Sequence, residues 1–287
     1  MPPKSRLGQN FLHDQQAIRR IVAVLGECGD RTVVEIGPGR GAITWALAAK
    51  AGRVLALEVD PELAARLSTE FSGGLPDSGT NAVGSNVEIE TVDVLSFDFA
   101  TASAAAGQRL IVAGNLPYYI TSPILLKLAE NAGALDRAVL MVQREVADRV
   151  TAEPGSRDYG LLSVTVQMHG PAERLFTLPP SAFAPPPDVH STVFRWRFAP
   201  RFEELKVDRE QFLRFMRQVF ALKRKTLANN LRAAGIDGAA IATALSDAGI
   251  DPKARAESLA VEVLAALWRS LKQTGAISSD EVAPAVH

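Results

Sequence analysis

The sequence predicts an α/β fold in which a doubly wound parallel sheet is followed by a small all-helical domain. Before residue 200, short apolar runs typical of buried strands alternate with segments whose apolar residues have helical spacing. Such alternation favours a parallel sheet with helices on its faces. After Pro200 only the helical spacing continues. We therefore predict a first domain over residues 1–200, a helical domain over 201–274, and a disordered tail over 275–287.

The predicted elements follow one another closely in the first half of the chain. The first is a helix over 14–28, where Ile18, Ile21, Val22 and Leu25 have helical spacing. The next elements expected, in chain order, are a strand, a glycine-rich turn and a helix over 31–50, a strand over 53–60, a helix over 61–71, strands within 86–95 and 109–119, a helix over 122–133, and a strand leading into a helix over 136–153.

Two later strands, over 163–168 and 191–198, are expected to complete the sheet, with the last pair antiparallel. The proline-rich segment 178–189 between them is predicted to be a fixed loop, and residues 73–86 a mobile loop. The segments expected to form the helical domain are 208–232, 236–249 and 256–271.

The composition is typical of an ordinary globular protein. Of the 287 residues, 47% are hydrophobic and 22% are charged. No stretch approaches the roughly eighteen apolar residues of a membrane-spanning helix, and the N-terminus lacks the apolar core of a signal peptide. Cys28 is the single cysteine, which excludes an internal disulfide and a cluster of cysteine metal ligands. The expected location is the cytoplasm.

Charge is unevenly distributed along the chain. The formal net charge is −1, yet residues 195–232 contain 11 Lys or Arg and 4 Asp or Glu, which gives 11 − 4 = +7 for this stretch and −8 for the rest. This asymmetry indicates that one region meets a polyanion while the remainder does not.

The segment EIGPGRG, from Glu35 to Gly41, lies between a predicted strand and its helix. Glycines at such a place let the backbone turn tightly and approach a ligand closely. A nucleotide-binding loop is one interpretation, and a plain tight turn is another. A loop for a nucleoside triphosphate is disfavoured, because no GK[ST] sequence follows.

Carboxylates end the next strands. Glu58 follows the glycines by about twenty residues, where an acid can accept hydrogen bonds from both hydroxyls of a ribose, although it could also be a solvated strand-end acid. Asp60 and Asp93 also fall at strand ends, which is where open α/β sheets bind ligands. Together these three positions predict a crevice for an adenosine group.

S-adenosylmethionine fits this crevice better than a dinucleotide does. Arg40 and Gly41 follow the second glycine of the loop, so the G-x-G-x-x-G spacing of a pyrophosphate site fails. The acidic Glu35 also suits a cationic sulfonium and amino group better than it suits a pyrophosphate.

The sequence GNLPYY after the fourth strand indicates a site for a purine amine. The side-chain oxygen of Asn115 and the carbonyl of Leu116, held by the rigid Pro117, can accept the two hydrogens of an adenine N6 amine. The nitrogen then becomes pyramidal as its bond to carbon forms. Tyr118 offers a face on which the base stacks. No strong general base is required, so the four histidines are expected on the surface or in loops.

Two interpretations of the aromatic residues stay open at this point. A strand-terminating turn with a core tyrosine would also explain Tyr118, but it leaves Asn115 unexplained. Phe183, in the proline-rich loop, is a second candidate stacking face, and plain core packing explains it equally well.

Eight motifs occur in the order found in the ribosomal RNA adenine N6,N6-dimethyltransferases, and the chain resembles that family from about residue 5 to 270. It is most similar to the bacterial small-subunit branch, the kasugamycin-sensitivity enzymes. The motifs are GQNFL (8–12), VVEIGPGRGAIT (33–44), LALEVD (55–60), the acid of VDVL (92–95), GNLPYYITSP (114–123), MVQREVADR (141–149), YGLLSVTVQ (159–167) and SAFAPPPDVHSTVF (181–194).

The resemblance implies a Rossmann-like S-adenosylmethionine-dependent methyltransferase domain that uses no metal. Its N-terminal residues would close over the cofactor, the glycines would lie beside the methionine part, Glu58 would hold the ribose, and Asp93 with Val94 would hold the adenine. The implied cofactor-binding set is Gln9, Asn10, Leu12, Gly37, Gly39, Glu58, Asp93, Val94 and Asn115. Tyr119 departs from the family, which usually has Asn there.

Members of this family dimethylate two adjacent adenosines in the 3′-terminal hairpin of small-subunit rRNA, late in assembly. The implied partner is therefore small-subunit rRNA within pre-30S particles, met by a monomer away from membranes. The basic run Lys223, Arg224 and Lys225 is the expected phosphate contact, which gives affinity with little sequence information. The target adenine would have to leave its stack to reach Tyr118.

Competing functions remain to be distinguished. The large-subunit rRNA adenine dimethyltransferases of macrolide resistance are the nearest enzymes, although KRKTLANNL (223–231) and YGLLSV (159–164) favour the small-subunit branch. A DNA adenine methyltransferase is disfavoured, because its motif is usually D-P-P-Y or N-P-P-Y. The chain could also act mainly as a non-catalytic ribosome-assembly factor.

Overall fold

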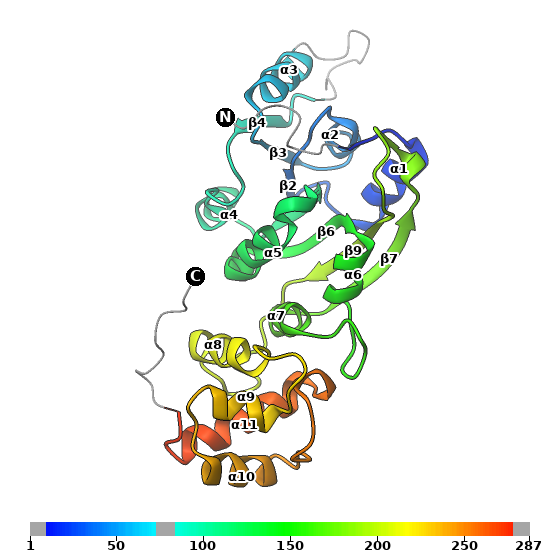
Figure 1. The fold of residues 1–287 in the computed structure, drawn as a ribbon. Coiled ribbons are helices and arrows are strands. Elements are labelled where there is room, and N and C mark those ends of the chain that lie inside the picture. The colour runs from blue at the N-terminus through cyan, green and yellow to red at the C-terminus, as the bar shows by residue number, and fades with distance from the viewer. Residues whose placement is uncertain (1–9, 73–83, 278–287) are drawn as a thin grey trace. The chain divides into compact units, whose positions relative to one another are not determined.

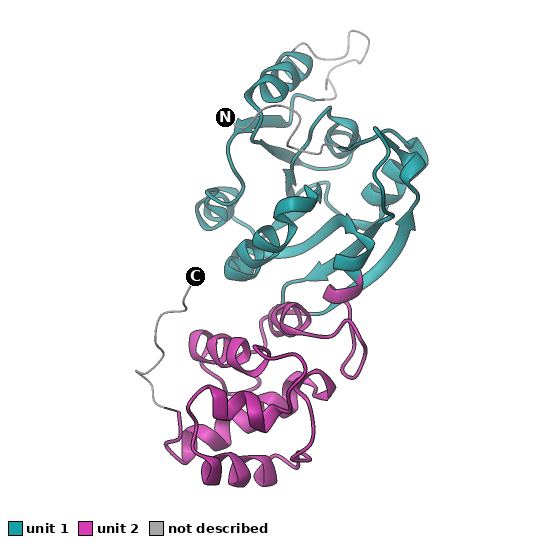
Figure 2. Ribbon diagram, in the orientation of Figure 1, with its two compact units in different colours: residues 1–147, 171–199 teal, residues 148–170, 200–287 magenta. Residues whose placement is uncertain are grey.

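The computed structural model describes residues 10–72 and 84–277, which divide into two compact units (Figure 2). The first contains residues up to 147 together with 171–199, and the second contains 148–170 together with the chain from residue 200. The sequence predicted a single division at residue 200. The structure differs in one respect, because residues 148–170 pack with the C-terminal helices.

The first unit is built on a seven-stranded sheet whose order is β4-β3-β2-β5-β6-β9-β7 (Figure 1). The first five of these strands are parallel, β9 runs antiparallel to β6, and β7 runs antiparallel to β9. The strands are β2 (Thr32–Ile36), β3 (Arg53–Glu58), β4 (Val87–Thr91), β5 (Leu110–Asn115), β6 (Leu135–Gln143), β7 (Ala172–Leu178) and β9 (Ser191–Arg197).

The central strands are apolar along their length because both faces of the sheet are covered. Every residue of β2 is buried. Ile111 and Ala113 of β5 point into the core formed with α1 and α2, so their alternate neighbours face the other side. The α-helices of this unit are α1 (Gln15–Val24), α2 (Ala42–Ala48), α3 (Pro61–Ser72), α4 (Phe99–Ala106), α5 (Thr121–Glu130) and the first part of α6 (Arg144–Val150). Helix α4 was not predicted from the sequence.

One predicted strand is wrong. Residues 163–168 form part of helix α7 (Leu161–His169), and the strand at this place in the sheet is β7 instead. The β-branched alternation of SVTVQM resembles a strand locally. The segment forms a helix rather than a strand because Val164 and Met168, one helical turn apart, can then both enter the core of the second unit.

The proline-rich loop holds more structure than its composition indicated. It contains a short 3₁₀ turn, η4 (Pro180–Ala182), followed by a two-residue strand, β8 (Phe183–Ala184). This strand pairs antiparallel with β1 (Phe11–Leu12) near the start of the chain. The further 3₁₀ turns are η2 (Tyr118–Ile120), η3 (Ala132–Ala134) and η5 (Ala256–Ser258).

The second unit is helical, as predicted, but the segment 208–232 forms two helices rather than one. Asp208 caps the first and Thr226 caps the second through side-chain oxygens that accept main-chain N–H groups. Besides α7, its helices are α8 (Arg209–Val219), α9 (Leu227–Ala233), α10 (Gly238–Asp247) and α11 (Val261–Gln273).

His169 contradicts the expectation that histidines lie on the surface. It ends α7 with only 1% of its side chain exposed, and a ring nitrogen lies 2.7 Å from the carbonyl oxygen of Thr165. Burial lowers its pKa to about 4, so it is neutral at physiological pH.

The basic stretch 195–232 is divided between the two units, with residues 195–199 in the first and the rest in the second. Arg195 lies on β9 and pairs with Glu173 of the neighbouring strand, while Arg201 pairs with Glu204 and Glu262 in the second unit. The predicted mobile loop at 73–86, up to residue 83, and most of the predicted tail lie outside the described residues.

Candidate cofactor and target-base site

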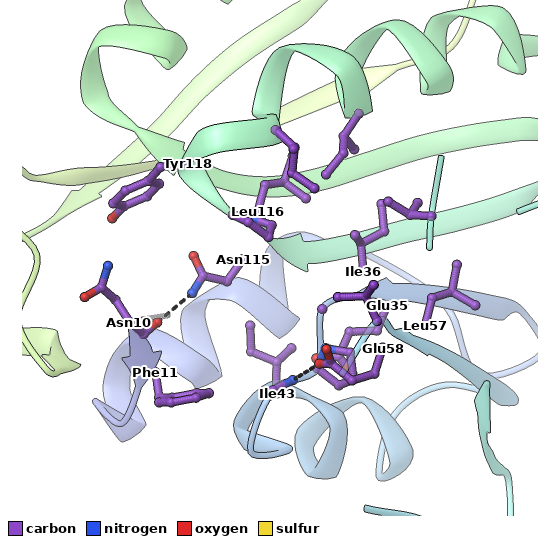
Figure 3. A pocket seen from close by; sticks show the side chains of 18 of the residues that line it. Asn10, Phe11, Glu35, Ile36, Ile43, Leu57, Glu58, Asn115, Leu116 and Tyr118 are labelled. Carbon is purple, nitrogen blue, oxygen red and sulfur yellow. Dashed lines mark hydrogen bonds between the residues drawn. The ribbon is translucent and has the colours of Figure 1, made fainter. Parts of the chain in front are cut away.

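A pocket opens at the carboxyl ends of β2, β3 and β5, with the loop after β4 as a further wall (Figure 3). The strand order reverses here, because β3 follows β2 on one side while β5 lies on the other. Open α/β sheets bind ligands at this kind of switch point. The pocket therefore occupies the place at which the predicted strand-end residues should meet.

Glu58 ends β3 inside this pocket and is 3% exposed. One carboxylate oxygen accepts the main-chain N–H of Gly39 and the other accepts that of Asp60, both at 3.0 Å. Burial raises its pKa, and the two N–H groups oppose that shift by stabilising the ionised form. The bonds fix the carboxylate, whose remaining lone pairs can accept further donors.

Glu35 lies on β2 in the same pocket with 1% exposure. Burial raises its pKa to about 8, and the adjacent Thr44 hydroxyl opposes part of that rise. Its Oε2 atom has no hydrogen-bond partner among the described residues. A buried carboxyl oxygen without a donor is costly, so this position favours a ligand that brings a donor or a positive charge.

The glycine loop is covered by the N-terminal residues of the described chain. Gly39 has a φ of +59°, and a Cβ there would lie 3.1 Å from the ring of Phe11. The guanidinium of Arg40 lies over the same ring, 4.3 Å from its centroid. Glycine at position 39 thus allows both the turn and the close approach of this aromatic ring.

Residues 10–14, which we call the strap, are tied to the proline-rich loop. Phe11 pairs with Ala184 in the β1–β8 ladder. The main-chain N–H groups of His13 and Asp14 both donate to the carbonyl of Ala182, at 3.0 and 3.4 Å. These bonds fix the strap, whose first three residues line the pocket.

Asn115 ends β5 and points into the pocket. Its side-chain nitrogen donates to the main-chain carbonyl of Asn10 at 3.1 Å, which turns Oδ1 toward the side where Tyr118 lies (Figure 3). The preceding Gly114 is required by packing, because a Cβ there would lie 2.7 Å from the carbonyl oxygen of Ile36 on β2.

Each of the next three residues, Leu116 to Tyr118, makes a hydrogen bond that fixes its position. The main-chain N–H of Leu116 donates to the carbonyl of Met141 at 2.9 Å, and the carbonyl of Pro117 accepts the Thr121 hydroxyl at 3.0 Å. The Tyr118 hydroxyl lies 2.8 Å from that of the buried Ser191, and the ring stays partly exposed at the pocket wall. Burial raises the pKa of Tyr118, so it is neutral at physiological pH. The interpretation of Tyr118 as a core tyrosine is therefore not supported.

The wall after β4 is formed by Asp93 and Val94. One oxygen of Asp93 accepts the N–H of Leu95 at 2.9 Å, and Asp93 itself is exposed while Val94 is 6% exposed. Tyr119 lies at the rim with 57% of its surface exposed.

The pocket brings together most of the residues predicted from the sequence. The predicted residues that line it are Asn10, Leu12, Gly37, Gly39, Glu58, Asp93, Val94, Asn115, Leu116, Pro117 and Tyr118. Gln9 lies outside the described residues. Phe183 does not line the pocket: it is 2% exposed and packs in the core between the sheet and α1, so the structure favours core packing over a second stacking face.

Lys223, Arg224 and Lys225 belong to the second unit. They form an exposed loop between α8 and α9, whereas the sequence placed them within a continuous helical segment.

Sequence reasoning missed the partners that hold the site together. Phe11 lies within the GQNFL motif, which was the available signal for it. Ser191, whose hydroxyl lies against that of Tyr118, belongs to the motif SAFAPPPDVHSTVF (181–194), but nothing in the sequence indicated its pairing with a residue 73 positions earlier.

Among the described residues, no group of three or more His, Cys, Asp or Glu side chains is arranged to hold a metal ion. No helix in this part of the chain is long and apolar enough to cross a membrane.

A model of the family described as ribosomal RNA adenine dimethylase matches residues 3–273. The chain is 55% identical over 269 residues to a protein of Acidobacterium capsulatum named ribosomal RNA small subunit methyltransferase A, covering 94% of this chain and 91% of the relative. It is 46% identical over 281 residues to a protein of the same name from Koribacter versatilis, covering 94% and 95%.

Solved structures show the same fold. The crystal structure of the 23S rRNA methyltransferase ErmE superposes with a TM-score of 0.70 at 26% identity, covering 92% of this chain and all (100%) of that one. A dimethyladenosine transferase from Plasmodium falciparum gives a TM-score of 0.74 at 20% identity, covering 93% and 98%. The fold alone therefore does not distinguish small-subunit from large-subunit substrates.

Proposed function

This chain belongs to the ribosomal RNA adenine dimethylase family, and from that premise we propose its substrate and the roles of its residues. The chain is an S-adenosylmethionine-dependent methyltransferase. We propose that it methylates N6 of two adjacent adenosines in the 3′-terminal hairpin of small-subunit (16S) rRNA, giving N6,N6-dimethyladenosines during late 30S assembly. The names of its relatives support the small subunit over the large one.

The observation that carries the chemistry is the pairing of Asn115 and Tyr118 at one end of a pocket whose other end holds Glu58. An aromatic face and an amide oxygen suit a purine amine, and a fixed carboxylate suits a ribose. The two sets of groups line one pocket, so a cofactor and a target base could lie there side by side.

The pocket fits S-adenosylmethionine on the chemistry of its own side chains. The unpartnered Oε2 of Glu35 suits the amino group of the methionine part, and Gly37 and Gly39, which line the same pocket, would lie beside that part. Glu58 would hold the ribose hydroxyls, and Asp93 with Val94 would hold the adenine. Asn10 and Leu12, in the strap, would close over the cofactor.

When bound, S-adenosylmethionine supplies an electrophilic methyl group on a sulfonium centre. The Oδ1 atom of Asn115 and the carbonyl of Leu116 would accept the two hydrogens of the target amine and draw its lone pair out of the purine ring. The rigid ring of Pro117 would keep these acceptors at a fixed angle. Tyr118 would hold the ring by stacking, worth about 1–3 kcal/mol. As the nitrogen–carbon bond forms, the sulfur–carbon bond would break with its electron pair going to sulfur. The methylated nitrogen, now positively charged and acidic, would then lose its proton to water, so the site needs no strong base.

The second unit would supply affinity for rRNA. Lys223, Arg224 and Lys225 are exposed together and would contact phosphates of the pre-30S particle. We propose that a monomer acts in the cytoplasm without a metal cofactor.

Incubation with labelled S-adenosylmethionine and undermethylated small subunits tests this function, when the modified bases are then mapped. We expect label on two adjacent adenosines of the 3′-terminal hairpin. Label that appeared only in large-subunit rRNA would overturn the proposed substrate, and the absence of any transfer would leave the non-catalytic assembly role.

A further inference from the structure

A buried amide on α9 holds the basic loop. Asn230 is 3% exposed, and its side-chain oxygen accepts the main-chain N–H of Leu222 at 2.8 Å. Its side-chain nitrogen lies 3.3 Å from the carbonyl of Leu222 and 3.4 Å from that of Thr226. One side chain thus satisfies both main-chain groups of Leu222.

The loop that Asn230 holds is a tight turn. The carbonyl of Leu222 also accepts the N–H of Lys225 at 3.0 Å, which closes residues 222–225. Leu222 is 44% exposed, although it is a large apolar side chain, and the three cations that follow it are exposed as well.

The main-chain groups of this loop do not need a buried side-chain amide as their hydrogen-bond partner. The loop lies at the surface, where water can satisfy its peptide groups. The flanking Leu227 and Leu231 of α9 are fully buried, so a leucine at position 230 would extend the same apolar face. A buried Asn that is bonded on both sides instead selects one conformation of the loop it contacts.

We propose that Asn230 is a positioning residue that presents residues 222–225 as a preformed rRNA-docking tip, and that Leu222 is its apolar contact. The three cations meet phosphates, while Leu222 packs against an unstacked base or ribose between them. The consecutive positive charges favour an RNA partner over a neutral surface. This inference rests on the proposed function.

Binding of the full-length protein to undermethylated small subunits, measured over a series of salt concentrations, tests the proposal. Asn230→Ala is expected to weaken binding about tenfold, since the loop must then be ordered on contact. The slope of log K against log salt should not change, because every charge remains. Leu222→Ala is expected to weaken binding about threefold to tenfold, also without a change in slope. Asn229→Ala, at an exposed position on the same helix, is the matched control and should bind normally.

Wild-type affinity of a folded Asn230→Ala variant would overturn the positioning role. If that variant fails to fold, Leu222→Ala decides, because it leaves the main-chain bonds to Asn230 in place; wild-type affinity then overturns the docking tip. Failure of the wild-type protein itself to bind small subunits would overturn the proposed function, and with it this inference.

Discussion

The side-chain nitrogen of Asn115 donates a 3.1 Å hydrogen bond to the main-chain carbonyl of Asn10, 105 residues earlier in the chain. An amide has one donor end and one acceptor end, so this bond determines which way Oδ1 faces. The strap, which lines the pocket, therefore also orients the side-chain amide of Asn115. Under the roles that we propose for these residues, this one hydrogen bond would couple the strap over the cofactor to the orientation of the acceptor for the target amine.

Replacement of Asn115 by Ala removes the acceptor that we assign to the target amine. We expect the rate of methyl transfer to fall about 100- to 1000-fold, as for other single donors or acceptors aimed at a transition state. Single-turnover transfer to undermethylated small subunits measures it. A rate within about tenfold of wild type would contradict the assignment. If binding alone is the cellular role, the variant keeps that role without methylation.

The Tyr118 ring and its hydroxyl can be separated by two variants. Tyr118→Phe keeps the stacking face and removes only the hydrogen bond with Ser191, so we expect a small change in KM for the small subunit. Tyr118→Ala removes the face, which should weaken target engagement by about 1–3 kcal/mol, or roughly 5- to 150-fold. Equal effects of the two variants would show that the hydroxyl, not the ring, matters.

Cofactor binding should depend on pH through Glu35. Its pKa of about 8 keeps it protonated at neutral pH in the ligand-free protein. A cationic amino group favours the ionised form, so binding releases a proton. Affinity should therefore rise by up to about tenfold per pH unit until about pH 8. Calorimetry in buffers of different ionisation enthalpy measures the released proton. The Glu35→Gln variant should bind the cofactor without releasing this proton.

The same carboxyl gives a stability prediction of definite sign. The pKa of Glu35 in the folded protein lies above its ordinary value of 4.5. Its contribution to the free energy of unfolding is therefore fully present below pH 4.5 and is lost as the pH rises to about 8. Without ligand, Glu35→Gln should gain stability relative to wild type over that interval. A constant difference between the two proteins from acid to pH 8 would show that Glu35 ionises normally.

Gly114→Ala should destabilise the first unit. The new Cβ would lie 2.7 Å from the main-chain oxygen of Ile36 in a central strand, where no side chain can move aside. We expect a decrease of about 1–3 kcal/mol in the free energy of unfolding, measured from urea midpoints. Gly133→Ala, where a Cβ meets nothing within 4 Å, is the control and should unfold like wild type.

Replacement of Lys223, Arg224 and Lys225 by Glu tests the proposed phosphate-binding role of the basic loop. Affinity for small-subunit rRNA should fall, and its salt dependence should flatten by about one unit of slope for each phosphate that the variant no longer neutralises. Unchanged affinity would remove the loop from the proposed interface.

The order of the parallel strands, and of the helices between them except α4, could be read from the sequence because each of these segments has its own hydrophobic period. Glu58, Asp93 and Asn115 fall at strand ends, and parallel strands bring their carboxyl ends to one edge. Their meeting in one pocket therefore followed from local patterns alone.

The contacts that complete the site needed the tertiary structure. A two-residue strand such as β1 has no period, and its partner β8 lies more than 170 residues away. The β1–β8 pairing and the bond from Asn115 to Asn10 therefore left no local signal. Residues 163–168 have a strand-like pattern, yet the core of the second unit makes them a helix. Phe183 could be a binding face or core by its chemistry, and only the packing around it decided. Sequence determines what each segment prefers locally, whereas the burial of distant segments against one another selects which preference is realised.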